Sequence, residues 1–299
     1  MKDTGERLIP KLHNKSIAYG EHLARYKSVC NLVNNKVVLD IACGTGYGTQ
    51  MLADNAERVY GVDVSGEAIE YAKKNYPHAK VTYKQGDARK IPLDDASVDV
   101  VVSLETIEHI PDPEEFVKEV KRVLKKGGQF VVSTPNDDEF TDGNIYHVHE
   151  FDFKELNRLM KKYFNNFEYF FQGSWFTSGI FSKVKFEKEF SKNSIEVKKS
   201  FSQKFDKAIY YIAVASDSSL QQLSENLVIA DVYSAKNEQE NSARTEKHIM
   251  DLNKKVERSE LQVKELQDEL SDIHQSRAWK LVTQVRTTIG KVPSSKKAK

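Results

Sequence analysis

The stretch Val37–Gly48, VVLDIACGTGYG, decides the fold of this chain. Its apolar run ends in Asp40, and glycines then follow at alternate positions. This order predicts a buried strand, a tight turn and a helix. Gly44 and Gly46 leave backbone amides open to a ligand, because no side chain stands in the way. The next apolar run, VYGVD, ends in Asp63, and an acid there suits hydrogen bonds to ribose hydroxyls. The stretch therefore predicts a nucleoside cofactor site.

The glycine loop differs from phosphate-binding loops. No Lys follows Gly46, so it is not G-x-x-x-x-G-K-[ST], and it does not follow G-x-G-x-x-G. The loop carries no base, and Asp40 before the glycines suits a cationic ligand with an amino group. LDIACGTGYG resembles motif I of the class I S-adenosylmethionine (SAM) methyltransferases. The resemblance implies SAM as the cofactor, and a generic glycine-rich turn is the alternative.

Strand-like runs alternate with helix-like segments along the first part of the chain. The alternation predicts a mostly parallel sheet covered on both faces. The helices are expected at Glu67–Asn75 and Pro113–Leu124, the second ended by the charges and glycines of residues 125–128. The runs number seven, as in the Rossmann-like methyltransferase sheet, whose last strand is an antiparallel insert. The expected strands are Val37–Ile41, Val59–Val62, Val81–Tyr83, Val98–Ser103, Phe130–Thr134, Phe167–Phe171 and Tyr210–Ala215.

Further cofactor contacts follow from the resemblance. Asp87, after the third strand, occupies the position of the acid that accepts a hydrogen bond from the adenine amino group. The segments GERLIP and HLARY resemble a lead-in helix of one bacterial branch, which implies that Arg25 and Tyr26 contact the cofactor carboxylate. Ordinary turn and surface roles are the alternatives. The expected cofactor-binding residues are Asp40, Ala42, Gly44, Gly46, Asp63, Val64, Asp87, Ala88, Arg25 and Tyr26.

Carboxylates and imidazoles recur at the expected carboxyl edge of the sheet, where open α/β sheets bind ligands. Glu105, Glu108 and His109 end the fourth strand, and His147 and His149 come after the fifth. Two carboxylates and two imidazoles could hold a divalent ion. Such an ion lowers the pKa of an alcohol hydroxyl, and a histidine then serves as general base.

The pattern Glu-x-x-Glu-His, followed later by His-x-x-Glu, resembles two methyltransferase groups. These are the small-RNA 2′-O-methyltransferases and the ubiquinone-pathway O-methyltransferases. The resemblance implies Mg²⁺ or Mn²⁺ held by Glu105, Glu108, His109 and His147. His147 is chosen over His149 because it stands three residues before Glu150. Glu105, His109 and His147 are the expected catalytic residues. A Glu-His pair that binds no metal is the alternative.

The composition changes after Ser216. Residues 218–275 carry seven bases and twelve acids, whereas residues 276–299 carry seven bases and no acid. Within 246–276, apolar residues at alternating spacings of three and four predict a coiled coil and hence a homo-oligomer, with a helix docked on the domain as the alternative. The expected order is a methyltransferase domain at 1–217, a polar linker at 218–245, the coiled coil, and a basic amphipathic tail at 277–299. The tail suits an anionic membrane surface or a protein partner, with a frayed tail as the alternative.

Bulk composition sets the remaining limits. The 299 residues have a net charge of +1 and contain two cysteines without C-x-x-C, which indicates a reducing cytoplasm. The first residues lack the apolar core of a signal peptide, and no run of about 18 apolar residues predicts a membrane span. The expected location is therefore the cytoplasm, with the inner face of the cell membrane left open through the tail.

Residues 4–173 resemble a bacterial branch found in surface-polysaccharide gene sets, some of whose members are O-antigen chain-terminating methyltransferases. The tail SRAWKL resembles the end of glycan-assembly enzymes. Together they imply O-methylation of a sugar hydroxyl on a glycan or glycolipid, with a glycan-assembly protein as a partner. Trp175, Phe176 and Phe181 suit either stacking on sugars or a core. The alternatives are an RNA 2′-O-methyltransferase, a catechol or nucleotide-sugar enzyme, and a SAM-binding scaffold. The near-neutral domain disfavours RNA, and no DNA partner is expected.

Overall fold

The structure is a computed structural model. It describes residues 7–13, 16–136, 139, 146–149, 151–175 and 204–228, and the single positions 259, 263, 264, 267, 271, 279 and 281. The chain divides into two units, Met1–Ala235 and Lys236–Lys299. The expected coiled coil and basic tail lie outside the described residues except at those single positions, and Glu150, Phe176 and Phe181 lie outside them as well. No helix in the described part of the chain is long and apolar enough to span a membrane.

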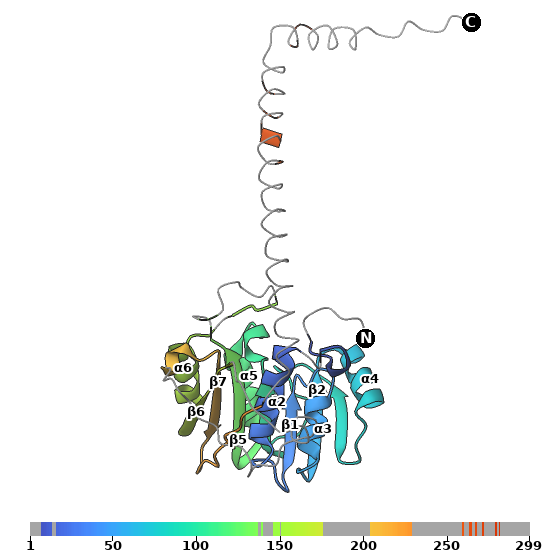
Figure 1. Cartoon of the computed structure of the whole chain (residues 1–299), viewed down its shortest axis with the longest axis vertical. Helices are drawn as coiled ribbons and strands as arrows, with labels where there is room; N and C mark the ends of the chain where they lie inside the picture. The colour runs from blue at the N-terminus through green and yellow to red at the C-terminus, as the bar shows by residue number, and fades with distance from the viewer. Residues whose placement is uncertain are drawn as a thin grey trace, which may run out of the picture. The chain divides into compact units, whose positions relative to one another are not determined.

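Unit 1 contains a seven-stranded sheet of order β3-β2-β1-β4-β5-β7-β6 (Figure 1). The strands from β1 to β5 pair in parallel, and β7 is antiparallel to both β5 and β6. All seven expected strands are confirmed, including the antiparallel insert. The strands are β1 (Val37–Ile41), β2 (Arg58–Asp63), β3 (Val81–Gln85), β4 (Val98–Leu104), β5 (Leu124–Pro135), β6 (Asn166–Gln172) and β7 (Tyr210–Ser216).

The helices begin at the polar residues that the sequence places before them. Ser65 caps α4, Asp112 caps α5 ahead of Pro113, and Asp152 caps α6. Each side chain accepts a hydrogen bond from a backbone amide of its helix. The helical segments are α1 (Pro10–His13), α2 (Ile17–Val29), α3 (Tyr47–Ala53), α4 (Gly66–Asn75), the 3-10 turn η1 (Ile107–His109), α5 (Pro113–Val123), α6 (Phe153–Tyr163) and the 3-10 turn η3 (Phe205–Lys207). Both expected helices are confirmed within one residue.

Residues 125–128 do more than end a helix. Helix α5 ends at Val123, and strand β5 already begins at Leu124, which pairs with Val98. The register then shifts before Val100 pairs with Gln129, and Gly127 has a φ of +81°. The segment LKKGG is thus an irregular start of β5. The positive φ at Gly127 explains why a glycine stands there.

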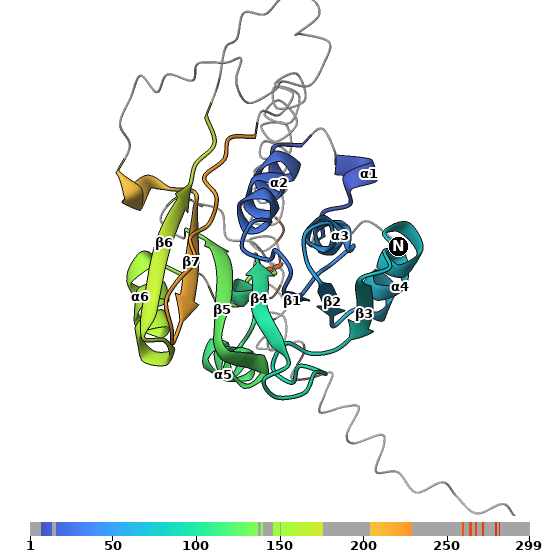
Figure 2. The same cartoon turned by 90° about the horizontal axis from the view of Figure 1, so that it is seen from below.

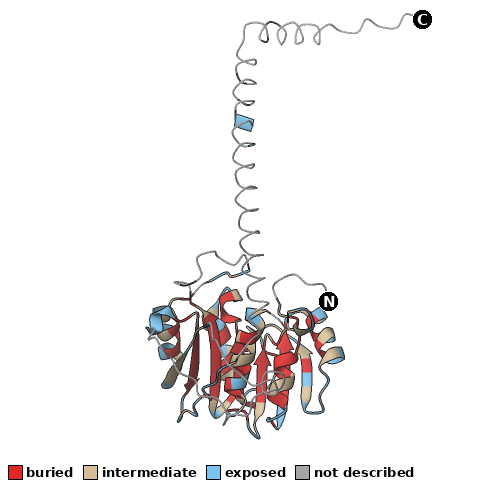
Figure 3. Ribbon diagram, in the orientation of Figure 1, coloured by how far each residue is buried: buried red, intermediate tan, exposed pale blue. Residues whose placement is uncertain are grey.

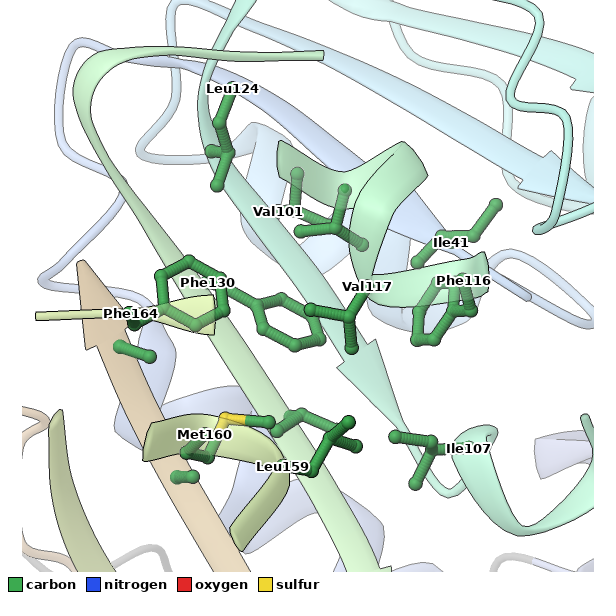
Figure 4. Packing of buried hydrophobic residues seen from close by; sticks show 14 of the residues in the cluster. Ile41, Val101, Ile107, Phe116, Val117, Leu124, Phe130, Leu159, Met160 and Phe164 are labelled. Carbon is green, nitrogen blue, oxygen red and sulfur yellow. The ribbon is translucent and has the colours of Figure 1, made fainter. Parts of the chain in front are cut away.

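The apolar residues of alternate strand positions form two cores, one on each face of the sheet. Helices α5 and α6 cover one face, and α2 and α3 cover the other (Figure 2). On the first face, Phe130 of β5 packs between Phe116 of α5 and Phe164, with ring centroids 5.9 Å away in both cases (Figure 4). The central strands are buried on both sides, as Figure 3 shows, which agrees with their near-continuous Val, Ile and Leu content.

The topology places the candidate site. Strand β1 lies between β2 and β4. After β1 the chain forms β2 and β3 on one side of it, and it then crosses to form β4 and β5 on the other side. Ligands of open α/β sheets bind at the carboxyl ends of strands at such a switch point. The residues that follow these two strands, Ala42 and Glu105, both have left-handed backbones, with φ of +58° and +54°. Left-handed non-glycine residues concentrate at functional sites.

Candidate active site

The glycine loop turns sharply between β1 and α3. Gly44 and Gly46 have φ of +53° and +86°, and Gly46 caps α3 in the left-handed conformation. A Cβ built on Gly46 would lie 2.6 Å from the Cβ of Ala72 and 2.9 Å from the hydroxyl of Tyr83. At Gly44 such a Cβ would meet no atom within 4 Å. Gly46 therefore serves close packing of α4 on the loop, whereas Gly44 borders open space.

Asp63 holds the loop in place. The amide of Gly44 donates to Oδ2 of Asp63 at 2.9 Å, and the amide of Ser65 donates to Oδ1 at 2.8 Å. Arg7 adds an ion pair at 3.8 Å. Each carboxylate oxygen retains a second lone pair, so the same side chain can still accept hydrogen bonds from a ligand.

A cavity of about 670 Å³ opens at this edge of the sheet, a size typical of small-molecule sites. Four acidic side chains and two guanidinium groups line it. Even with Glu108 uncharged, the acids outnumber the guanidinium groups, which suits a ligand with positive charge. Seven of the expected cofactor-binding residues line the cavity: Tyr26, Ala42, Gly44, Asp63, Val64, Asp87 and Ala88. Gly46 does not line it but caps α3 two residues after Gly44.

Asp87 does not stand alone at the cavity wall. Arg89 donates to both of its carboxylate oxygens, from Nε at 3.1 Å and from Nη2 at 2.7 Å, and its amide adds a third bond at 2.8 Å. These bonds, the side-chain ones foremost, lower the pKa of Asp87. Asp87 is therefore an ionised hydrogen-bond acceptor.

Asp40 and Arg25, two of the expected cofactor contacts, do not line the cavity. Asp40 is sealed beneath Tyr26 and Thr49: Thr49 donates to Oδ2 at 2.6 Å, and the Tyr26 hydroxyl lies 3.4 Å from Oδ1. Tyr26 can lie there because Gly48 has no side chain, since a Cβ would come within 1.9 Å of the Tyr26 ring. The sequence places Asp40 beside the glycine loop, but it does not show that the ring of Tyr26 covers the Asp40 side chain.

Replacing Asp40 by asparagine is expected to stabilise the ligand-free protein at alkaline pH. Burial, opposed by the bonds from Thr49 and Tyr26, raises the pKa of Asp40 to about 7 from 3.8. The native state then binds a proton that the unfolded state has lost, so wild-type stability falls as the pH rises between these values. The variant lacks this loss, and its advantage in free energy of unfolding grows to at most about 4 kcal/mol by pH 8.

Urea unfolding of both proteins at pH 4, 6 and 8 measures this difference. A stability difference that does not change with pH would show that Asp40 does not titrate in this range.

His22 was missed as a cavity residue. It lines the wall beside Tyr26, and its Nδ1 lies 2.7 Å from the hydroxyl of Tyr47. Burial, followed by the charge of Arg25, lowers the pKa of His22 well below its usual value, so the imidazole is neutral. The helical spacing of four residues between His22 and Tyr26 could have indicated a shared face.

Glu105 is held by the neighbouring strand. Its amide donates to the carbonyl and hydroxyl oxygens of Ser133 at 3.2 and 3.0 Å, and the Ser133 hydroxyl donates to Oε1 at 2.5 Å. The side chain lines the cavity. This bonding compensates the strain of its left-handed backbone.

Glu108 lies in η1 and is 1% exposed. Oε2 accepts a hydrogen bond from Thr134 at 3.3 Å, whereas Oε1 is buried without a hydrogen-bond partner. Burial, and then the charge of Glu105, raises the pKa of Glu108 well above its usual value. A buried carboxylate oxygen with no partner is costly, and it is the feature that a bound cation would explain.

His109 is oriented by a backbone carbonyl. Its Nδ1 lies 2.9 Å from the carbonyl oxygen of Tyr146. A carbonyl only accepts hydrogen bonds, so Nδ1 carries the proton, and the lone pair of the neutral ring is on Nε2. The Nε2 atom lies 4.0 Å from Oε1 of Glu108. The side chain can thus accept a proton or ligate a metal through Nε2.

The ring of His147 packs edge-on against that of His109, with centroids 4.9 Å apart. Ligand atoms of Glu108, His109 and His147 all lie within 4.8 Å of one another. Burial, and then His109, lowers the pKa of His147, which favours the neutral ring that ligates metals. The structure thus brings together three of the four expected ligands, while Glu105 lies outside this group.

His149 faces elsewhere. Its Nε2 lies 3.4 Å from Glu155, and its ring packs on Phe151. His149 is not among the three side chains whose ligand atoms lie together.

The seven-stranded sheet with an antiparallel β7, the glycine loop after β1 and the acids at the ends of β2 and β3 are the features expected from the resemblance to class I SAM-dependent methyltransferases. Residues 39–132 match the family described as "Methyltransferase domain". Residues 39–132 are therefore similar to a methyltransferase domain.

The similarity extends to curated proteins. The chain is 39% identical over 163 residues to a "probable S-adenosylmethionine-dependent methyltransferase" of Mycolicibacterium smegmatis, covering 53% of this chain and 63% of the relative. It is 36% identical over 107 residues to the ubiquinone biosynthesis O-methyltransferase of Idiomarina loihiensis, covering 34% of this chain and 43% of the relative. The chain thus spans less than two thirds of the length of these relatives.

Among solved structures, a SAM-dependent methyltransferase from Thermotoga maritima resembles the chain with a TM-score of 0.50 and 24% identity. The match covers 70% of this chain and 92% of that one. At this identity the likeness shows the fold.

Proposed function

We propose that the protein is a SAM-dependent O-methyltransferase that methylates a hydroxyl group of a sugar in a bacterial surface glycan. The observation that carries the oxygen acceptor is the orientation of His109. The Tyr146 carbonyl fixes the proton on Nδ1, so Nε2 is available at the cavity wall to receive a hydroxyl proton.

The cavity fits the methyl donor. Open space at Gly44 admits a ligand beside the loop amides, and Asp63 and Asp87 offer carboxylate oxygens to ribose hydroxyls and the adenine amino group. The excess of carboxylates over guanidinium groups in the wall suits a sulfonium. SAM carries its methyl group on a positively charged sulfur. That sulfur is a good leaving group because it becomes a neutral thioether when the methyl group departs.

The proposed reaction is an in-line displacement. The acceptor oxygen bonds to the methyl carbon as the carbon–sulfur bond breaks, and the electron pair of that bond goes to sulfur. The proton of the hydroxyl goes to Nε2 of His109. The fold contributes by holding the acceptor oxygen in line with the methyl group, which removes much of the entropic barrier.

We also propose that a divalent cation, Mg²⁺ or Mn²⁺, assists the reaction. Glu108, His109 and His147 would hold it, and the buried, unpartnered Oε1 of Glu108 fits that role. The cation would lower the pKa of the acceptor hydroxyl. If Nε2 of His109 binds the metal, another group must receive the proton of the acceptor hydroxyl. Metal dependence of the reaction therefore distinguishes His109 as a metal ligand from His109 as the general base.

The glycan acceptor rests on features of the sequence. Residues 4–173 resemble a bacterial branch found in surface-polysaccharide gene sets, and the tail resembles the end of glycan-assembly enzymes. We propose that the heptad of 246–276 forms an oligomer. Under this proposal the tail contacts a membrane surface or an assembly protein. A small catechol-like acceptor is the second candidate, favoured by the similarity to the ubiquinone biosynthesis O-methyltransferase.

Transfer of labelled methyl groups from SAM to glycans, catechols and RNA, with and without a chelator, tests the proposal. We expect transfer to a glycan. Loss of transfer in the chelator, with recovery on adding Mg²⁺ or Mn²⁺, would support the version in which His109 is a metal ligand. Transfer only to catechols or RNA would show that the acceptor is not a glycan. Full transfer in the chelator would show that no metal ion is needed. SAM binding without any transfer would contradict the enzyme and favour a scaffold.

A further inference from the structure

Arg25 is a buried cation with an unusual set of partners. Its side chain extends from α2 into the interior and is 2% exposed. Nη1 donates to Oε1 of Gln172 at 2.8 Å, and the guanidinium lies 4.3 Å from the centre of the Tyr210 ring. Nε makes no hydrogen bond and lies 3.9 Å from Oε1 of Glu105. Burying such a charge is costly unless it is compensated, so these contacts define its role.

Glu105 is the carboxylate that compensates this charge at the cavity. Burial acts against the charged form of Arg25, yet its pKa is raised because Glu105, and then Tyr210 and Glu21, favour the cation. The separation of 3.9 Å is too long for a hydrogen bond but short for an ion pair in the interior. Nε of Arg25 therefore interacts with Glu105 through charge and not through a hydrogen bond.

The contacts of Arg25 also join separate elements. Gln172 ends β6, and its Nε2 donates to the carbonyl of Glu21 on α2 at 3.1 Å. Tyr210 begins β7, and its hydroxyl donates to the carboxylate of Glu21 at 2.9 Å. Helix α2, whose Tyr26 lines the cavity, is thereby fixed to the strand ends next to Glu105.

We infer that Arg25 is a positioning residue, which holds the strained Glu105 carboxylate in its orientation at the cavity and acts on methyl transfer through it. Arg25 itself does not line the cavity, whereas Glu105 does. This role differs from the contact with the cofactor carboxylate expected from the sequence. The inference rests on the proposed function for its activity readout.

A double-mutant cycle in the full-length protein tests it, with Arg25→Gln, Glu105→Gln and their combination. Small losses of alignment cost up to about 100-fold in rate, so we expect each single variant to lower kcat by about 10- to 100-fold. The double variant should lose little more than Glu105→Gln alone, because Arg25 has nothing left to position. The Kd for SAM should stay within about twofold, a change worth only a few tenths of a kcal/mol.

Two further variants separate positioning from folding. Arg25→Lys keeps the charge and should recover part of kcat. Ser28→Ala removes a hydroxyl that donates to the Arg25 carbonyl one turn along α2, and it should leave kcat unchanged even if the protein is less stable. The inference would be overturned if Arg25→Gln and Arg25→Lys lost total activity equally, had a lower melting temperature and kept the wild-type kcat per folded molecule.

Multiplicative losses in the double variant, or a raised Kd for SAM at unchanged kcat, would overturn it too, the latter in favour of a direct cofactor contact. If the wild-type protein transfers no methyl group at all, the proposed function fails separately. The same cycle is then measured on the free energy of unfolding, where additive effects overturn the inference and non-additive effects support the Arg25–Glu105 coupling.

Discussion

Replacing Gly44 by alanine is expected to remove most of the affinity for SAM while the protein stays folded. The left-handed backbone costs an alanine about 1–2 kcal/mol, and the new methyl group meets no protein atom within 4 Å. It stands instead in the open space where the ligand approaches the loop. Overpacking of about 1–3 kcal/mol then corresponds to a loss of affinity of about 5- to 150-fold.

Gly48→Ala is the matched control, because the same methyl group is added four residues further along the chain, in α3. Its Cβ would come within 1.9 Å of the buried Tyr26 ring, so this variant should lose stability instead. Calorimetric titration with SAM and thermal unfolding distinguish the two outcomes. Full affinity in Gly44→Ala would mean that the donor does not bind against this loop.

The strands and helices of unit 1 could be predicted from local sequence because each carries its own signal. Short runs of aliphatic and aromatic residues indicated where all seven strands lie, and Pro113 was the expected start of α5. The irregular start of β5 could not be predicted in this way. The pairing of Leu124 with Val98 and the shifted register after it depend on the neighbouring strand.

The candidate site was predictable where a residue's role follows from its place at a strand end. Asp63, Asp87 and His109 lie where the sequence places them, at the carboxyl edge of the sheet. Side-chain contacts across the fold were not predictable. Asp40 is covered by Tyr26, and Arg25 is drawn inward by Gln172 and Tyr210, residues that lie far away in the sequence.

Loss of the His109 side chain is expected to have the largest effect on methyl transfer. General bases contribute about 10²- to 10⁴-fold, so His109→Ala should lower kcat by that factor. The residues proposed to bind SAM, Gly44, Asp63 and Asp87, are not altered, so the Kd for SAM should change little. Single-turnover transfer with labelled SAM, together with the calorimetric Kd, measures both quantities.

His149→Ala is the control, because His149 belongs to the same short segment as His147 but pairs with Glu155. It should retain wild-type kcat. A base acting alone and a metal ligand differ in their response to added cation: excess Mg²⁺ or Mn²⁺ should rescue part of the activity of His109→Ala only if Glu108 and His147 still hold the ion. Wild-type kcat in His109→Ala would show that the acceptor loses its proton to another group, and the cavity would then have to bind its acceptor away from η1.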